Sequence, residues 1–471
     1  MDRSPTFWTA AVTKAAALTV GLYFLGTLLG LAGIAWRYAI PAWGWALAAA
    51  WGLLAFLLIR VGVGAPLRRA IAACLAAALA LRLVVLVAVN GFEGVETGND
   101  YAAYLTLARN LAEGNGLLAH TMNYGWVRGL YPPLYPLLLA GAGAAGGFNA
   151  VTILALNSAI DLASAGLLVA IGRRLGDIRI GLAAASLYMI WPSAAITASL
   201  AAKEGLVNFL ALFIVLMFQR MLDDGPGWRD AALLGLGTAL MALTQPGLAL
   251  LPLSIFLVLL PFAGARPLIL FGARALPFAI LTMLPWWIRN YALFGAFVPL
   301  TTSMGPAMMV AVGRVPGERA QLLMSGDEPA RSALMIREAG GLIAADPFGF
   351  VTGRIPHIIR QMVFEDYDAL RLAGFNPPFA WARAVLPAAQ LSLACAVGLA
   401  FAALASRRAL AKDRFLAPIL LACLLHIGLF GIWFEFGERH RHFVTPFLLL
   451  MVGSFAVRVL SSPGANRNQD Q

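Results

Sequence analysis

The chain has 471 residues, of which 61% are hydrophobic and only 12% are charged, and its mean hydropathy is +0.80. An average soluble domain carries about 25% charged residues, so this composition excludes a soluble multidomain protein, a disordered chain and a disulfide scaffold. The net charge of +11 comes from Lys and Arg clusters that flank apolar runs, a pattern typical of cytoplasmic loops and not of a nucleic-acid-binding surface. The sequence therefore predicts an all-α protein that crosses a membrane many times.

The apolar runs divide the chain into spans. A helix needs roughly 20 apolar residues to cross a bilayer, and on this measure we expect about twelve spans. They lie near 13–35, 42–62, 69–90, 150–172, 179–195, 202–220, 229–244, 246–263, 275–290, 385–405, 415–434 and 443–460. Residues 1–65 then form an N-terminal hairpin of two spans, residues 66–460 form the main transmembrane unit, and 461–471 form a disordered tail.

The basic clusters predict the orientation. They lie at 60–69, 173–179, 266–274 and 407–414, and with this set of spans all of them face the side of the N-terminus, which is the cytoplasm. Both termini are then cytoplasmic, and the long segments 91–149 and 291–384 lie outside. Loops of this length in a compact domain are usually functional. The Ala-, Leu- and Arg-rich composition favours a bacterial plasma membrane.

Two short helices are expected in the first outer segment. The first follows Asp100, and its apolar face is formed by residues at helical spacing, Tyr101, Tyr104, Leu105, Ala108 and Leu111. It is too short and polar to cross the bilayer, so we expect it in the membrane interface, ending at Gly114 and Gly116. The second begins at Pro132 and Pro133, since proline suits a first helical turn. It is predicted to dip into the membrane without crossing it.

Four motifs follow one another along residues 69–460. They are an acidic residue with a Tyr-x-x-Tyr helix and a Gly-x-Gly end at 100–116, Tyr-Pro-Pro-Leu-Tyr-Pro at 131–136, Pro-Trp-Trp-Ile-Arg-Asn at 285–290, and Glu-Arg-His-Arg-His at 438–442. In this order the set resembles the GT-C glycosyltransferases, and most of all glycosyltransferase family 39, the relatives of protein O-mannosyltransferases and of the lipid A aminoarabinose transferase. The resemblance implies a GT-C arrangement of helices. It also implies inverting transfer of a sugar from a polyprenyl-phosphate carrier to a lipid, glycan or protein acceptor at the outer face.

The resemblance assigns the acidic residues. An acceptor hydroxyl must lose a proton, which requires a positioned carboxylate, and Asp100 matches the acidic residue that serves as general base in the family. The alternative is that Asp100 caps the helix that starts at Tyr101. Glu204 matches a second acidic position that orients the acceptor or binds a metal, and its alternative is an anchor among lipid headgroups. Asp100 and Glu204 would also allow a shared divalent metal, Mg or Mn.

The leaving phosphate gains negative charge and requires cations. The candidates are Arg128, Lys203, Arg289, Arg439 and Arg441. For these residues the alternatives are a solvated loop charge, a snorkelling lysine or a helix-end anchor. Substrate contacts are expected from Tyr101, Tyr104, Tyr131 and Asn290. The chain departs from the family at Tyr131, where relatives often carry a basic residue, and at Gln245, where many have arginine before proline.

Two rival functions remain open. A multi-span transporter or flippase should show symmetric halves, broken helices and charges at the midplane, whereas here the halves show no symmetry and the charges lie in outer segments and at span ends. A polymerase or ligase of surface polysaccharide would use the same donor but would not need Asp100. Two weaker expectations concern histidines: His440 and His442 alternate as if on an extended metal-binding segment, and His426 is expected to be a satisfied interior histidine.

Overall fold

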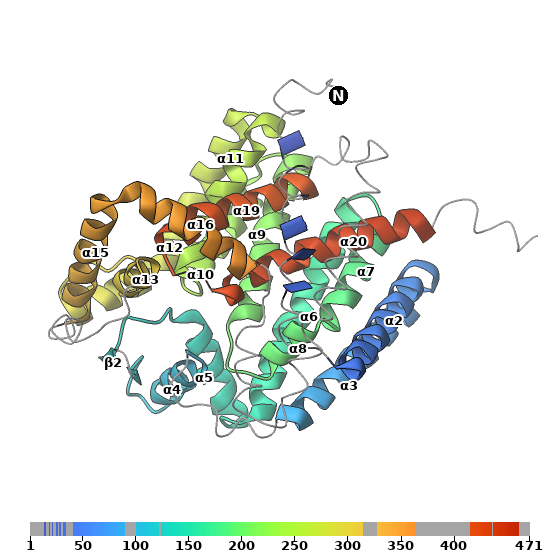
Figure 1. The fold of residues 1–471 in the computed structure, drawn as a ribbon, viewed down its shortest axis with the longest axis horizontal. Helices are drawn as coiled ribbons and strands as arrows, with labels where there is room; N and C mark the ends of the chain where they lie inside the picture. The colour runs from blue at the N-terminus through green and yellow to red at the C-terminus, as the bar shows by residue number, and fades with distance from the viewer. Residues whose placement is uncertain are drawn as a thin grey trace, which may run out of the picture.

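The computed structural model describes residues 41–89, 100–121, 124–313, 327–362, 415–435 and 437–460, with isolated positions between 14 and 33. These residues form helices and one short β-hairpin (Figure 1). The elements are α2 (Ala42–Gly64), α3 (Leu67–Val89), α4 (Asp100–Ala112), β1 (Ala119–Thr121), β2 (Gly125–Val127), α5 (Leu134–Gly146), α6 (Ala150–Arg174), α7 (Ile178–Met189), α8 (Pro192–Ala198), α9 (Glu204–Asp224), α10 (Trp228–Ala242), η2 (Pro246–Leu248), α11 (Leu251–Ala263), α12 (Ala265–Phe294), α13 (Met304–Ala311), α15 (Glu328–Ala345), α16 (Pro347–Met362), α19 (Leu416–Trp433), η4 (Glu438–Val444) and α20 (Thr445–Leu460).

Eight helices of the described part are long and apolar enough to cross a membrane, or nine if α7 and α8, which meet at a 58° bend, count as one span. The prediction of an all-α, multi-pass membrane protein is confirmed. The expected span at 229–244 is α10, which has only 15 residues and is shorter than the roughly 20 that a bilayer requires. The expected spans at 13–35 and 385–405 lie largely or wholly outside the described residues, as does the tail 461–471.

α12 covers both the loop expected at 266–274 and the span expected at 275–290. It runs for 30 residues without a break, so Arg266 and Arg274, predicted to lie in a loop, are in its first turns. A helix of this length is about 45 Å long and can carry polar turns beyond a bilayer core of about 30 Å. The Arg274 guanidinium lies 4.9 Å from the ring centroid of Trp228, a cation–π contact between α12 and the first residue of α10.

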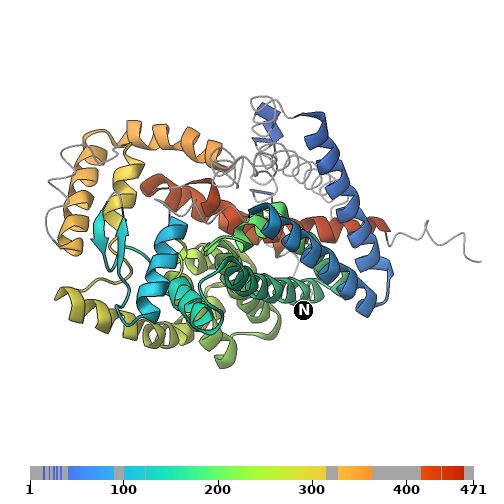
Figure 2. The same cartoon turned by 90° about the horizontal axis from the view of Figure 1, so that it is seen from below.

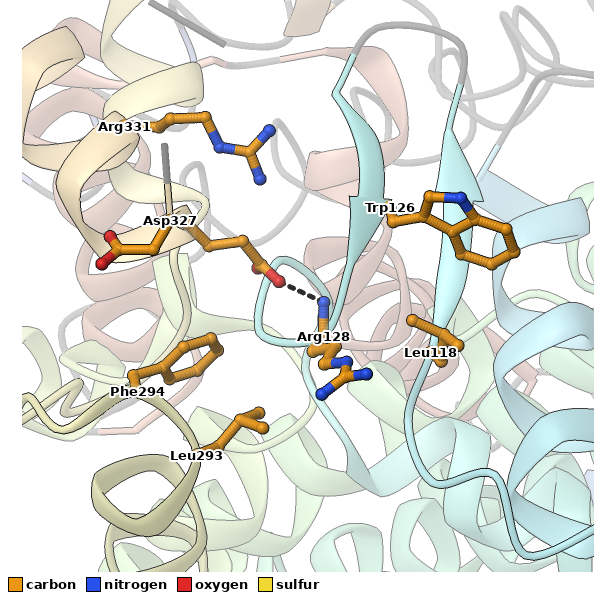
Figure 3. A pocket seen from close by; sticks show the side chains of 8 residues that line it. Leu118, Trp126, Arg128, Leu293, Phe294, Asp327 and Arg331 are labelled. Carbon is orange, nitrogen blue, oxygen red and sulfur yellow. Dashed lines mark hydrogen bonds between the residues drawn. The ribbon is translucent and has the colours of Figure 1, made fainter. Parts of the chain in front are cut away.

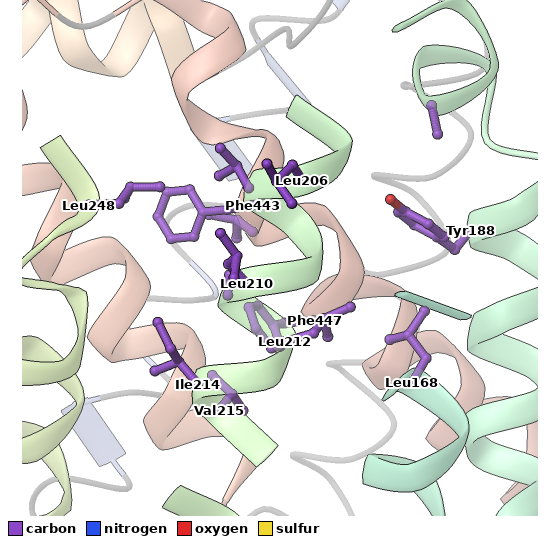
Figure 4. Packing of buried hydrophobic residues seen from close by; sticks show 14 of the residues in the cluster. Leu168, Tyr188, Leu206, Leu210, Leu212, Ile214, Val215, Leu248, Phe443 and Phe447 are labelled. Carbon is purple, nitrogen blue, oxygen red and sulfur yellow. The ribbon is translucent and has the colours of Figure 1, made fainter. Parts of the chain in front are cut away.

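The buried core surrounds α9 and α20. In the apolar window of α9, 72% of residues are buried, and in the span Arg439–Leu460 78% are, against 22% in α2 and in α12. Figure 4 shows Leu206, Leu210 and Ile214 of α9 beside Phe443 and Phe447. The peripheral helices therefore carry the apolar surface expected to face lipid, while α9 and α20 are enclosed by protein.

Glycines let the central helices approach closely. A β-carbon on Gly172 of α6 would lie 2.2 Å from the backbone nitrogen of Gly181 in α7, and one on Gly453 of α20 would lie 2.5 Å from the carbonyl oxygen of Ile180. Small residues at such crossings increase van der Waals packing, which is a main source of helix association in membranes. The positions of α6, α7 and α20 thus depend on these glycines.

The two long polar segments contact each other. The backbone N–H of Thr302 donates to the carbonyl of Gly129 at 2.9 Å, and the Arg331 guanidinium donates to the carbonyl of Tyr124 at 2.9 Å. Figures 1 and 2 show α4, the hairpin, α13 and α15 gathered on one side of the molecule. The described residues of the two long segments, 91–149 and 291–384, therefore lie together on one side of the molecule.

The two short helices of the first segment have the predicted bounds. α4 starts at Asp100, buries Tyr101, Tyr104, Leu105 and Ala108, and is followed by Gly114 and Gly116 with φ of +83° and +73°. Only glycine adopts such angles without strain, so the predicted end of the helix is confirmed. α5 has 13 residues, too few to cross a bilayer.

Candidate active site

Asp100 forms an ion pair with a residue from the far end of the chain. Its carboxylate accepts a hydrogen bond from the guanidinium of Arg439, 339 positions away, which lies in η4. It also accepts from the hydroxyl of Tyr131 at 3.2 Å. Among the described residues no backbone N–H donates to this carboxylate, and each of its two oxygens accepts from a side chain. The exposed fractions of the two side chains are 28% for Asp100 and 24% for Arg439.

The charge state of Asp100 follows from this environment. Burial alone raises the pKa of the carboxyl, but the Arg439 guanidinium and the Lys203 ammonium outweigh it and bring the pKa below its ordinary value. Asp100 is therefore an ionised carboxylate at neutral pH. A group held in this way is a weak proton acceptor as long as Arg439 stays bound to it.

Lys203 is a buried cation at the start of α9. It is 9% exposed, and its Nζ lies 5.4 Å from the ring centroid of Tyr104, a cation–π contact. In the described part of the chain its ammonium makes no hydrogen bond or ion pair. Burial, followed by the like charge of Arg439, lowers its pKa to about 8, although Asp100 and Glu204 act in the opposite direction. Lys203 thus has hydrogen-bond donors available for an anion.

Glu204 follows Lys203 and is the first residue of α9. Glu204 is 5% exposed. Within the described residues its Oε2 has no hydrogen-bond partner. The positive end of the helix dipole favours a carboxylate here. Buried polar atoms are nearly always hydrogen-bonded, so this oxygen is available to a bound hydroxyl.

The rings of three tyrosines, Tyr104, Tyr131 and Tyr135, pack together beside Asp100 and Lys203. The Tyr104 ring meets those of Tyr131 and Tyr135 edge to face, with centroids 5.5 and 5.7 Å apart. Burial and the Asp100 carboxylate raise the pKa of Tyr104 and of Tyr131, so both hydroxyls stay protonated and can donate. Of the predicted substrate contacts, Tyr131 donates to Asp100 and the Tyr104 ring contacts Lys203. Tyr101 and Tyr104 both belong to the buried core.

A buried ion pair lies beneath the first turn of α9. Arg82 donates to Asp161 at 2.6 Å, and the side chains are 4% and 3% exposed. Tyr188 donates to the other oxygen of Asp161 at 3.0 Å, and a β-carbon on Gly205 would lie 3.2 Å from that oxygen. The expectation that charges lie only in outer segments and at span ends is wrong here, since Asp161 is in the middle of α6.

Arg289 and Asn290 brace a loop. Arg289 donates to the carbonyl of Arg128 at 2.8 Å and to the side-chain oxygen of Asn290 at 2.8 Å, and its guanidinium lies 4.8 Å from the ring centroid of Trp286. Asn290 is fully buried and donates to the carbonyl of Val298 at 3.0 Å. No hydrogen bond or ion pair among the described residues links them to Asp100 or Lys203. These contacts are those of the helix-end anchor, which was the alternative for Arg289.

Glu328 is a buried carboxylate that the sequence analysis did not single out. One carboxylate oxygen accepts from the backbone N–H of Arg128, and the other accepts from the N–H of Gly129 at 2.9 Å and from the hydroxyl of Thr302 at 3.0 Å. Its only signal was an acidic residue within the mixed charges of the second long segment. Beside it lies a cleft of about 370 Å³ (Figure 3).

The acidic residues fit an ion pair better than a divalent metal. Both oxygens of Asp100 are engaged, by Arg439 and Tyr131, and two cations lie beside the carboxylates. In the ranges that the structure describes, no three His, Cys, Asp or Glu side chains gather in a metal-binding group. We therefore route no chemical step through a metal at Asp100 and Glu204.

His426, His440 and His442 lie in helices, and the contacts of His426 and His440 are to protein groups. His440 and His442 lie in the 3-10 helix η4 and not in an extended segment, and His440 accepts a hydrogen bond from the backbone N–H of Gly437 at 2.8 Å. The prediction for His426 is confirmed, since its ring nitrogens lie 2.8 Å from the carbonyl of Gly247 and 3.2 Å from the hydroxyl of Ser254.

No protein-family model, curated protein or solved structure matches the chain. The resemblance to glycosyltransferases is therefore carried by the four sequence motifs and weighed against the geometry around Asp100.

Proposed function

We propose that the chain is a membrane glycosyltransferase of the GT-C type, which transfers a sugar from a polyprenyl-phosphate carrier with inversion. The observation that carries the proposal is the meeting of Asp100, Arg439 and Lys203 at the start of α9. A carboxylate next to two cations answers the two requirements of the reaction, a proton acceptor and a stabiliser of the leaving phosphate.

The reaction can be written with these residues. The acceptor oxygen bonds to the anomeric carbon while its proton passes to the Asp100 carboxylate. The bond between the anomeric carbon and the phosphate oxygen breaks, and its electron pair stays on the phosphate. Arg439 and Lys203 stabilise that negative charge, and the free oxygen of Glu204 accepts a hydrogen bond from an acceptor hydroxyl. Attack opposite the leaving group inverts the configuration.

Arg439 couples donor binding to the basicity of Asp100. A general base is most effective when its pKa is near the working pH, whereas Arg439 and Lys203 keep the pKa of Asp100 below its ordinary value. A donor phosphate that takes Arg439 away from Asp100 removes part of this effect and makes the carboxylate a better base. The proposal thus includes an order of events in which the donor binds before proton transfer.

The proposed setting is the outer face of a bacterial plasma membrane, with both termini in the cytoplasm. It follows from the basic clusters, since cytoplasmic loops are enriched in Lys and Arg. The acceptor class is a lipid, a glycan or a protein, because a hydroxyl beside Asp100 is all that the reaction requires of it.

The test is transfer from a panel of polyprenyl-phosphate sugars by the full chain in nanodiscs, compared with Asp100→Asn. We expect the variant to lose about 100- to 10,000-fold in rate, the usual contribution of a general base. Asp223→Asn is the matched control, since Asp223 is an exposed aspartate near the opposite end of α9, paired with Arg174. Equal transfer by wild type and Asp100→Asn would overturn the assignment of the base.

A transporter is the second candidate, and the buried pair Arg82–Asp161 favours it. Ionisable groups inside a membrane often mark substrate or ion pathways, and the 58° bend between α7 and α8 is the kind of broken span found in transporters. Proteoliposomes loaded with the same lipid-linked sugars separate the two functions. Movement of the intact donor across the bilayer without transfer would favour the transporter.

A further inference from the structure

One cleft in the described part of the chain has no role in the transfer step described above. It is the cleft of about 370 Å³ between the β-hairpin and α15 (Figure 3), a size within the range of small-molecule sites. Its lining residues are Leu118, Trp126, Arg128, Leu293, Phe294, Asp327, Glu328 and Arg331. It thus combines apolar and aromatic walls with two arginines.

The backbone that carries Arg128 is held on both sides. Its N–H donates to Glu328, and its carbonyl accepts from Arg289 at 2.8 Å. At the next residue the N–H of Gly129 donates to Glu328 at 2.9 Å and the carbonyl accepts from Thr302 at 2.9 Å. A side chain on so well-fixed a backbone loses less freedom when it binds a ligand, which strengthens binding.

The two arginines of the cleft keep hydrogen-bond donors available, whereas its two carboxylates are engaged at three of their four oxygens. The exposed guanidinium of Arg128 makes no hydrogen bond or ion pair with any residue that the structure describes, and Arg331 uses one nitrogen on the carbonyl of Tyr124. By contrast, both oxygens of Glu328 are bonded, and Asp327 caps α15 by accepting from Ala330 at 2.7 Å. Guanidinium groups recognise planar or tetrahedral oxyanions with several donors at once.

We propose that this cleft binds a phosphorylated sugar of the acceptor, with the phosphate on Arg128 and Arg331. The indole of Trp126, 64% exposed, offers a flat apolar face to the sugar, and Phe294 adds a second aromatic wall. This inference rests on the proposed transferase function and adds an acceptor class to it.

One short segment of the chain connects the cleft with the proposed base. Arg128 and Tyr131 are three residues apart, so their backbones lie at most about 10 Å apart, and the Tyr131 hydroxyl donates to Asp100. Because of this connection we assign the phosphorylated sugar to the acceptor that Asp100 deprotonates.

The test measures binding of glucose 6-phosphate to the full chain in phosphatidylcholine nanodiscs by titration calorimetry. Glucose and inorganic phosphate are titrated in parallel. We expect glucose 6-phosphate to bind more tightly than either, and Arg128→Gln and Arg331→Gln each to weaken it about tenfold, the effect of one charge-assisted hydrogen bond. Arg337→Gln is the matched control, because Arg337 is an exposed arginine of α15 that does not line the cleft.

Each other outcome overturns the inference. Equal affinity for glucose 6-phosphate in wild type and Arg128→Gln excludes the site, and an equal loss in Arg337→Gln indicates general attraction of anions. Inorganic phosphate binding as tightly as glucose 6-phosphate removes the sugar from the assignment. Competition in phosphatidylglycerol nanodiscs would identify a lipid headgroup as the occupant instead.

The binding assay contains no donor, so it is independent of transfer. If all variants bind alike while Asp100→Asn loses transfer, the cleft assignment fails and the transferase stands. If Arg128→Gln loses binding but wild type transfers no sugar, the phosphosugar site is supported and the proposed transferase fails.

Discussion

Two arginine–aspartate pairs lie near the start of α9, and they differ in exposure. In the pair Asp100–Arg439 the side chains are 28% and 24% exposed, whereas in Arg82–Asp161 they are 4% and 3% exposed. The buried pair has further fixed partners, since Tyr188 donates to Asp161 and Arg82 donates to the carbonyl of Met189 at 2.7 Å. In the other pair, Asp100 also accepts a hydrogen bond from Tyr131.

The difference separates a structural pair from one that can exchange partners. Removing one member of a buried pair leaves a charge in a medium that does not solvate it, which is strongly destabilising. In the pair Asp100–Arg439 about a quarter of each side chain is exposed, so water competes for both charges and the pair contributes less to stability than a buried one. Arg439 can therefore leave Asp100 for a phosphate at small cost, whereas Arg82 stays with Asp161.

The largest effect is expected from Arg82→Met. The variant leaves the Asp161 carboxylate buried without its cation, and we expect a loss of about 3–5 kcal/mol in the free energy of unfolding, measured by chemical denaturation in detergent micelles. The double variant Arg82→Met with Asp161→Leu should recover most of that loss. An unchanged midpoint in the single variant would show that the pair is not what holds α3 to α6.

Arg439→Gln should weaken phosphate binding without a comparable loss of stability. Because a charge-assisted hydrogen bond is worth about 1.5–3 kcal/mol, affinity for farnesyl phosphate should fall about 10- to 100-fold, measured by calorimetry in nanodiscs. Arg458→Gln is the control, because Arg458 lies near the C-terminal end of α20, whereas Arg439 lies in η4 before that helix. Unchanged affinity would remove Arg439 from the phosphate site.

The protonation of Lys203 predicts a pH dependence. Its pKa is lowered to about 8 by burial, so the ammonium loses its proton as the pH rises through 8, whereas a phosphate monoester with its second pKa near 6 keeps its charge. Farnesyl phosphate should therefore bind about tenfold more weakly above this pH. Lys203→Arg should remove the inflection, since arginine does not titrate in this range. An inflection that persists in Lys203→Arg would point to another group.

The smallest effect is expected from Asp100→Asn on donor binding. Removal of the carboxylate removes the competitor of the phosphate for Arg439, and since exposed pairs are worth up to about 1 kcal/mol, farnesyl phosphate should bind up to about fivefold more tightly. The same titration measures it, and the unfolding midpoint should barely change. Weaker binding in this variant would mean that Asp100 helps to hold the phosphate and does not compete with it.

Local features were predictable from the sequence, because they depend on neighbouring residues. The start of α4 at Asp100 and its end before Gly114 follow from apolar spacing and glycine. The lengths of α10 and α12 were not predictable in this way, since Arg266 and Arg274 look like loop residues until a helix longer than the bilayer includes them.

Partners far apart in sequence could not be predicted. Asp100 and Arg439 were both expected in the site, but their pairing depends on how η4 packs against α9. Arg82 and Asp161 each look like an isolated charge in an apolar run, and only the packing of α3 on α6 pairs them. The motif at 285–290 predicted a phosphate ligand in Arg289 and a substrate contact in Asn290, whereas in the structure these side chains donate to the carbonyls of Arg128 and Val298.

The bend between α7 and α8 has a consequence for the first helices of the chain. A broken span leaves carbonyls without helical partners, and in hydrocarbon each such group costs several kcal/mol. Here the carbonyl of Ile190 accepts from the indole of Trp51 in α2 at 2.9 Å, and that of Met189 accepts from Arg82 in α3. Side chains of α2 and α3, more than a hundred residues earlier in the chain, therefore stabilise the bend between α7 and α8. A protein made from residue 66 onward would keep Arg82 but lose Trp51, and water or a straightened helix would have to replace the lost hydrogen bond.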